Sequence, residues 1–151
     1  MSFTRCYYHV IFRTKNSEPT IPVGEDIELY KYIWGFSKNK RTVLYQINGM
    51  PDHLHLFVSL PPSLALSDFV KELKNSTNIW LKEHQSLFPN FHGWSVGYAG
   101  LSYGETEKES VIQYIKKQKE HHRQESFKDE LKRVLLNNGF VIDDGYFDKE
   151  I

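Results

Sequence analysis

Stretches rich in β-branched and aromatic residues alternate with stretches in which apolar residues recur every three or four positions. The former predict four strands, at residues 5–13, 41–48, 53–60 and 94–103. The latter predict two helices, one over residues 25–38 and one whose N-cap is Ser67. The resulting order β-α-β-β-α-β is that of a ferredoxin-like split βαβ antiparallel sheet, a fold of the α+β class. We therefore expect both helices on one face of the sheet and the first and third strands at its centre.

Two further helices are expected after the fourth strand. Residues 107–120 are rich in good helix formers and contain no glycine or proline. Thr106 and Glu109 have the spacing of a capping box at the start of this helix. A short last helix is expected over residues 130–138, where Gly139 ends it. We expect the helix over 107–120 to dock on the sheet face that the first two helices leave open.

The third predicted strand begins with the sequence His53-Leu54-His55. Side chains alternate between the two faces of a strand, so both histidines share one face and Leu54 takes the other. Two adjacent neutral imidazoles offer nitrogen lone pairs that can bind a divalent metal. The same spacing equally fits two polar residues on the solvated face of a half-buried strand. On a central strand, the histidines would lie on the face opposite the first two helices.

The helix over residues 107–120 carries a second candidate pair. Tyr114 and Gln118 are four residues apart, which places them one helical turn apart on the same face. Gln118 could ligate a metal through its carbonyl oxygen, and Tyr114 could act as a nucleophile beside that metal. Taken alone, a tyrosine at the edge of the core and a solvated glutamine are the more common interpretations.

Length and composition indicate a single domain over residues 1–151, which is long enough to form a core. We expect the core over residues 1–125 and a C-terminal helix with an acidic tail over residues 126–151, in which no chemistry is recognisable. The chain has one cysteine, Cys6, and therefore no internal disulfide. It has neither an apolar run long enough to cross a bilayer nor a secretory leader pattern, so we expect a cytoplasmic protein with no membrane contact.

The charge balance argues against an overall basic surface. The chain has 19 lysine and arginine residues and 19 aspartate and glutamate residues. A DNA-binding protein neutralises phosphates, so any such contact here must come from a local basic patch. For most candidates an ordinary solvated face is the favoured interpretation. The candidates include Arg41, Lys71, Lys74 and Lys117.

The order of four segments resembles the single-tyrosine HUH transposases of small bacterial insertion sequences, including the REP-associated ones. HUH denotes a histidine, a bulky hydrophobic residue and a second histidine. The segments are "PDHLHLFVSLP", "FVKELKNSTNIWL", "WSVGY" and "VIQYIKKQ". Each motif is weak alone, and their common order makes the resemblance specific. It covers residues 5–124.

The resemblance implies a role for each candidate residue. His53, His55 and Gln118 would be ligands of Mg²⁺ or Mn²⁺, and Tyr114 would be the nucleophile. Asp52 precedes the first histidine in many of these proteins, and it could accept a hydrogen bond from a ligating imidazole or simply form the turn. Such enzymes cleave and rejoin single-stranded DNA at hairpin-containing element ends through a 5′-phosphotyrosine. They are often homodimers that exchange the tyrosine helix.

Two other functions are compatible with the same fold. A ferredoxin-like module could bind nucleic acid on its open sheet without any chemistry. A metal-dependent nuclease could use water in place of Tyr114. The joint occurrence of the histidine pair and the Tyr114–Gln118 pair, in the expected order, favours a transposase.

Overall fold

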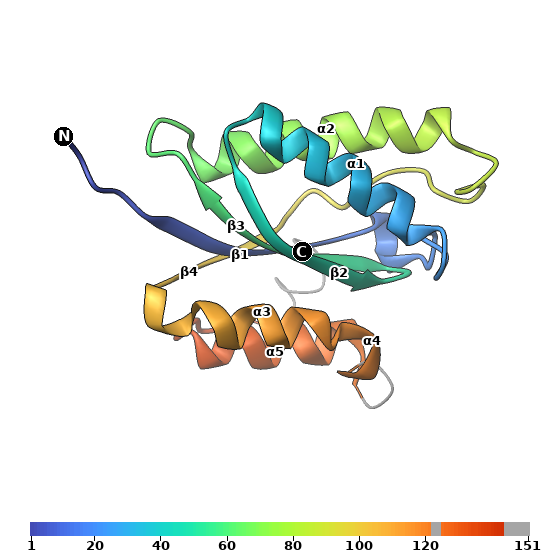
Figure 1. Ribbon diagram of the computed structural model, residues 1–151. Coiled ribbons are helices and arrows are strands. Elements are labelled where there is room, and N and C mark those ends of the chain that lie inside the picture. The colour runs from blue at the N-terminus through green and yellow to red at the C-terminus, as the bar shows by residue number, and fades with distance from the viewer. Residues whose placement is uncertain (122–124, 144–151) are drawn as a thin grey trace.

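Four antiparallel strands form the sheet in this computed structural model, which describes residues 1–121 and 125–143 (Figure 1). The strands lie in the order β2-β3-β1-β4, so β3 and β1 form the central pair. This confirms the predicted α+β fold with a ferredoxin-like strand arrangement. Their bounds are β1 Cys6–Arg13, β2 Val43–Met50, β3 His53–Leu60 and β4 Ala99–Tyr103.

Helices α1 (Asp26–Asn39) and α2 (Leu66–Glu83) cover one face of the sheet and form the main core with it (Figure 1). Side chains of β1 and β3 that point to this face are fully buried; they include Val10, Phe12, Leu54 and Leu56. They pack in one cluster with Leu29 and Ile33 of α1 and with Phe69 and Leu73 of α2. The alternation along β1 and β3 therefore assigns this face to apolar packing.

Helix α2 begins earlier than the sequence predicts. Its N-cap is Ala65, and Leu66 is already helical and packs against the main core. The prediction that Ser67 caps this helix is therefore wrong, because the packing of Leu66 against the main core draws residues 66 and 67 into the first turn.

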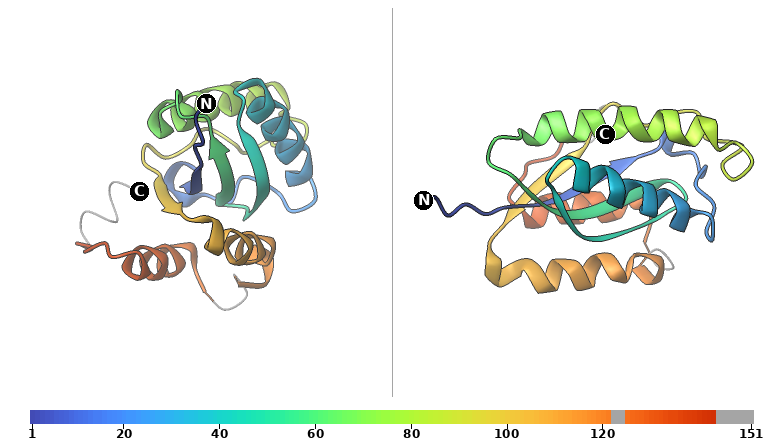
Figure 2. Two further views of the ribbon diagram at one scale, coloured as in Figure 1. Left: turned by 60° about the vertical axis from the view of Figure 1, so that its left-hand side comes forward. Right: turned by 45° about the horizontal axis from the view of Figure 1, so that its top comes forward.

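Helices α3 (Lys108–Lys116), α4 (Gln118–His121) and α5 (Phe127–Asn137) lie on the other face, as both views in Figure 2 show. This arrangement confirms that the tyrosine helix docks on the face that α1 and α2 leave open. The sheet is thus enclosed between two helical layers. Within the described ranges, we find no helix that is long and apolar enough to cross a bilayer.

The predicted helix over 107–120 is interrupted at Lys117. The amide of Asn48, on β2, donates hydrogen bonds to the carbonyl oxygens of Ile115 (3.1 Å) and Lys116 (3.0 Å). These carbonyls would otherwise accept bonds from later turns of the same helix. Local helix propensity predicts continuation here, and the contact with β2 overrides it.

The start of α3 also differs from the prediction. A 3-10 turn, η2 (Glu105–Glu107), precedes it, and the Glu107 carboxylate accepts a hydrogen bond from the Gly104 amide at 3.1 Å. The residues that close the helix start are therefore Gly104 and Glu107. Thr106 lies inside the turn, so the prediction of a Thr106–Glu109 capping box is wrong.

The ends of β2, β4 and α5 also differ from the predicted bounds. The β2–β3 turn contains only Pro51 and Asp52, and β4 begins at Ala99, because Trp94 makes only an isolated bridge with Thr14. Helix α5 begins at Phe127 because the Ser126 hydroxyl accepts a hydrogen bond from the Asp129 amide at 3.2 Å. Residues 144–151 of the predicted acidic tail lie outside the described part of the chain.

Candidate metal and tyrosine site

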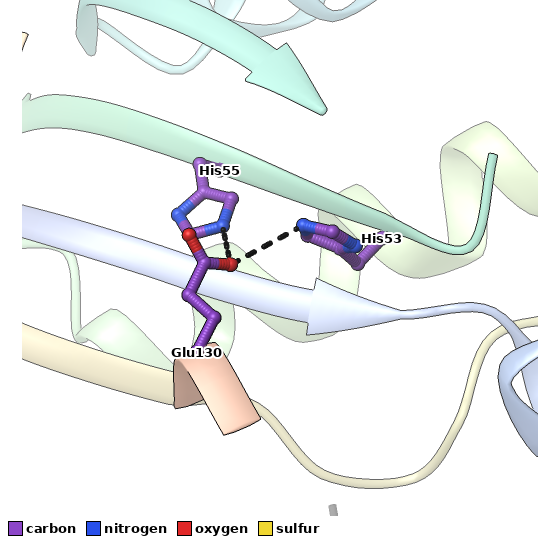
Figure 3. Close-up of side chains that lie close together, drawn as sticks. All are labelled: His53, His55 and Glu130. Atoms are coloured by element: carbon purple, nitrogen blue, oxygen red, sulfur yellow. Dashed lines mark hydrogen bonds and ion pairs between the residues drawn. The ribbon is translucent and has the colours of Figure 1, made fainter. Parts of the chain in front are cut away.

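His53 and His55 lie on β3 and point to the face covered by α3–α5. Both side chains are fully buried. Figure 3 shows the two imidazoles turned toward a carboxylate of α5, that of Glu130. One ligand atom from each of the three residues lies within 4.8 Å of the others. The predicted histidine pair is therefore part of an enclosed polar cluster.

Close approach of β2 allows this hairpin to form. A Cβ atom on Gly49 would lie 2.2 Å from the carbonyl oxygen of His53. Such a contact is impossible without moving the backbone, so glycine is required where β2 passes the first histidine.

A second side chain contacts each imidazole at Nδ1, the ring nitrogen that does not face Glu130. Nδ1 of His53 lies 2.7 Å from Oδ1 of Asp52, and Nδ1 of His55 lies 2.8 Å from Nε2 of His9. A carboxylate can only accept, so Nδ1 of His53 donates to Asp52. When Nδ1 of His55 likewise donates to His9, the Nε2 atoms of both histidines face Glu130. The structure thus places Asp52 where it orients a histidine.

His9 is a part of the site that our sequence analysis missed. Burial, together with the nearby His55, lowers the pKa of His9 well below its ordinary value. The neutral imidazole that results can accept the bond from His55. His9 pairs with Phe57 across β1 and β3, and alternation along β1 places it on the same face as the histidine pair. That alternation is the signal that would have identified it.

Gln118 reaches the histidines from α4. Its Oε1 lies 3.0 Å from Nε2 of His53, and its Nε2 donates to Oε2 of Glu130 at 2.6 Å. The side chain is fully buried. The carbonyl oxygen therefore faces the cluster, as a metal ligand would.

Tyr114 reaches the same cluster from α3. Its hydroxyl donates to Oε2 of Glu130 and accepts a hydrogen bond from Arg133 at 3.1 Å. Burial and the bond to Glu130 raise the pKa of Tyr114 above its ordinary value. Although the helix is interrupted between them, the structure brings Tyr114 and Gln118 together with both histidines.

Glu130 is the centre of the cluster and the second residue that our sequence analysis missed. Its side chain is 1% exposed. Oε1 lies 3.1 Å from Nε2 of His55 and 3.5 Å from Nε2 of His53, while Oε2 bonds Tyr114 and Gln118. Residues 126–151, in which the sequence shows no recognisable chemistry, thus contribute a carboxylate to the candidate site. Its position within the apolar stripe of α5, beside Phe127, Leu131 and Val134, is the signal that was available.

The electrostatics of the cluster fit a bound cation. Burial opposes a charge on His53, but its bonds to Asp52 and Glu130 outweigh burial and raise its pKa above the ordinary value. The imidazole is therefore held where a positive charge is favoured. Two imidazole nitrogens, a carboxylate oxygen and an amide oxygen form a donor set that suits a divalent transition metal. The residues present fit such an ion.

The four predicted DNA contacts are dispersed over the molecule. Lys117 is exposed at the break between α3 and α4, on the site's side of the sheet. Arg41 lies in the turn before β2, and Lys71 and Lys74 lie on α2, across the sheet from the site. Lys74 donates to the carbonyl oxygens of residues 95, 96 and 97 at 2.8, 3.1 and 2.6 Å, and burial lowers its pKa to about 8. Lys74 thus ties a loop to α2.

The chain is similar to known transposases over most of its length. The family model for IS200-like transposases matches residues 2–118. The ISDra2 transposase TnpA of Deinococcus radiodurans is 33% identical over 116 residues, which cover 74% of this chain and 82% of the relative. The transposase for insertion sequence element IS200 of Salmonella typhimurium is 22% identical over 122 residues, covering 78% of this chain and 80% of the relative.

Two solved structures share the fold. A crystal structure from Deinococcus radiodurans, described as a transposase, has a TM-score of 0.60 at 24% identity and covers 78% of this chain and 93% of its own. A REP-associated tyrosine transposase bound to a REP hairpin has a TM-score of 0.59 at 15% identity, over 95% of this chain and 93% of its own. With the family model matching most of the sequence and one relative above 30% identity, the chain belongs to the IS200-like transposase family and is a transposase.

Proposed function

We propose that this transposase cleaves and rejoins single-stranded DNA at the ends of its insertion sequence, with Tyr114 as the nucleophile and a divalent metal beside it. The observation that carries the proposal is the convergence of Tyr114, Gln118 and both histidines on Glu130 in one buried cluster. The REP hairpin bound to a structural relative supports hairpin-containing DNA as the substrate.

His53, His55, Gln118 and Glu130 would hold the metal. When bound, the cation would polarise the scissile phosphate and offset its negative charge. The mixture of nitrogen and oxygen donors favours Mn²⁺ over Mg²⁺, which prefers oxygen ligands alone. Asp52 and His9 would keep the two imidazoles in the orientation that ligation needs.

The hydrogen bonds around Tyr114 define the proposed proton path. As its oxygen attacks phosphorus, the phenol proton leaves along the bond to Oε2 of Glu130. The bond from phosphorus to the 3′ oxygen breaks, and that oxygen takes a proton from solvent. The products are a 5′-phosphotyrosine and a free 3′-hydroxyl. Because the phosphodiester energy is kept in the covalent link, a 3′-hydroxyl can later displace the tyrosine without ATP.

The tyrosine and the histidines of a single chain meet in this structure. The bonds from Asn48 to the end of α3 and from Gln118 to His53 join the tyrosine segment to its own sheet. A homodimer that exchanges this helix stays a prediction from the family resemblance. Lys117, beside Gln118, is the predicted DNA contact that best fits the position of the site, and Arg41 and Lys71 stay predictions.

A denaturing gel tests the proposal. The protein is mixed with single-stranded DNA from its element's ends, with and without Mn²⁺. We expect a metal-dependent band that resists denaturant, that is lost in Tyr114→Phe and that persists in Tyr32→Phe, a control tyrosine of α1 on the opposite side of the sheet. Shortened DNA without a band would indicate a nuclease that uses water. Intact DNA without a band would indicate a binding module.

A further inference from the structure

The oxygen of Tyr114 lies between two groups of opposite charge, both on α5. Glu130 contacts it from the buried side, and Arg133, one helical turn later, contacts it from the solvent side. The Glu130 side chain is 1% exposed, whereas that of Arg133 is 43% exposed. The guanidinium therefore lies on the solvent side of the nucleophile, where a substrate can approach it.

An open cleft of about 280 Å³ leads to this side of Tyr114. Arg133 is the cation of its lining, and the other polar groups are neutral. The lining includes His9, Tyr103, Ser110, Tyr114, Asn137 and Asn138. A DNA backbone that enters the cleft would bring a phosphate to the guanidinium and to the tyrosine oxygen together.

Glu125 holds the guanidinium in this position. Its carboxylate accepts from Nε at 3.1 Å and from Nη2 at 2.8 Å, and Nη2 also donates to Tyr114. No residue in the described ranges bonds to Nη1 of Arg133, which leaves two N–H donors for a ligand. The Arg133 and Glu125 side chains are 43% and 25% exposed, so solvent reaches this ion pair and a phosphate can compete with the carboxylate for the guanidinium.

We propose that Arg133 binds the scissile phosphate beside Tyr114 and stabilises the negative charge that develops on its non-bridging oxygens during attack. This inference rests on the proposed function. A guanidinium matches two phosphate oxygens with parallel hydrogen bonds, which an ammonium cannot do. Because the chain has equal numbers of basic and acidic residues, a cation held next to the nucleophile supplies locally the positive charge that a phosphate needs.

The test is the single-turnover rate of adduct formation with Mn²⁺ and single-stranded element-end DNA. Replacing Arg133→Gln should slow adduct formation by roughly 100- to 1,000-fold, the effect of removing one donor to a developing oxyanion. Arg133→Lys should recover part of that loss by keeping the charge without the paired donors. Lys128→Gln, which removes an exposed cation from the same helix, should leave the rate unchanged.

Two further readouts separate this role from a structural one. The melting temperature and the Mn²⁺ affinity without DNA should be unchanged in Arg133→Gln. A wild-type rate in that variant, or a loss of rate in step with stability and metal affinity, would overturn the proposal. If the wild-type enzyme forms an adduct, the proposed function stands whatever Arg133 does; if it forms none, both proposals fail.

Discussion

The two faces of the sheet are packed in different ways. On the α1–α2 face, one apolar cluster runs without interruption from the strands to both helices. On the α3–α5 face, two smaller apolar clusters flank the polar cluster of His9, His53, His55, Gln118 and Glu130. The same strands supply both faces, because alternate residues point in opposite directions. The fold thus derives most of its apolar burial from one face and carries its candidate site on the other.

The polar cluster is buried at little cost because its members satisfy one another. Within the described part of the chain, Thr20 carries the single buried side-chain atom that lacks a hydrogen-bond partner, and it lies outside the cluster. Buried polar groups that are fully bonded keep a defined geometry, whereas an unbonded group would destabilise the fold. From this difference between the two faces, we expect the apolar face to govern stability and the polar face to govern metal binding.

The largest effect should come from the apolar face. Phe69 of α2 is fully buried in the main core. Replacing Phe69→Ala should lower the free energy of unfolding by about 3–5 kcal/mol, through lost burial and the cavity left behind. Urea denaturation followed by circular dichroism measures this change. Molecules that stay folded should bind Mn²⁺ as the wild type does; a parallel loss of metal affinity would show that the two faces are not separable.

The next effect should come from Glu130. Replacing Glu130→Gln keeps the shape of the side chain and removes the charge that faces both histidines. We expect Mn²⁺ affinity to fall by about a hundredfold or more. Loss of a group that only hydrogen-bonds to a metal ligand already lowers metal affinity about 10- to 100-fold, and Glu130 would be a ligand itself. Isothermal titration calorimetry without DNA provides the value. Asp129→Asn, an exposed neighbour on α5, is the control, and equal affinities in all three proteins would exclude Glu130 as a ligand.

A smaller effect should come from Asp52, which contacts the metal site only through His53. An asparagine amide is a weaker acceptor than a carboxylate, and its NH₂ group cannot accept at all. Asp52→Asn should therefore loosen the hold on the imidazole and weaken Mn²⁺ binding by about 10- to 100-fold. The same titration measures it, and Asp68→Asn, an exposed residue on α2, serves as the matched control. A wild-type Mn²⁺ affinity in Asp52→Asn would show that Asp52 only forms the turn and does not orient His53.

Local pattern predicted the fold and part of the candidate site. Alternation along β3 placed His53 and His55 on one face, and the spacing of Tyr114 and Gln118 placed them on one side of a helix. The structure brings all four together. These inferences hold because strand and helix periodicity is a local property of the sequence.

The site residues that were not predicted depend on contacts between segments that are distant in the sequence. Asn48 interrupts the tyrosine helix from β2, and α5 brings Glu130 to His55, 75 positions away in the chain, and Arg133 to Tyr114, 19 positions away. No local pattern encodes how α5 docks, so a charged residue in its apolar stripe could be seen as unusual but not assigned a partner. His9 is an intermediate case, since its face was predictable and its bond to His55 was not.

The most direct test of the account is to locate the covalent bond. The wild-type enzyme is incubated with Mn²⁺ and single-stranded element-end DNA, the DNA is trimmed with nuclease, and tryptic peptides are sequenced by mass spectrometry. We predict a nucleotide attached to Tyr114, in the peptide over residues 109–116. Attachment to any other residue, or cleaved DNA with no modified peptide, would contradict the assignment of Tyr114 as the nucleophile.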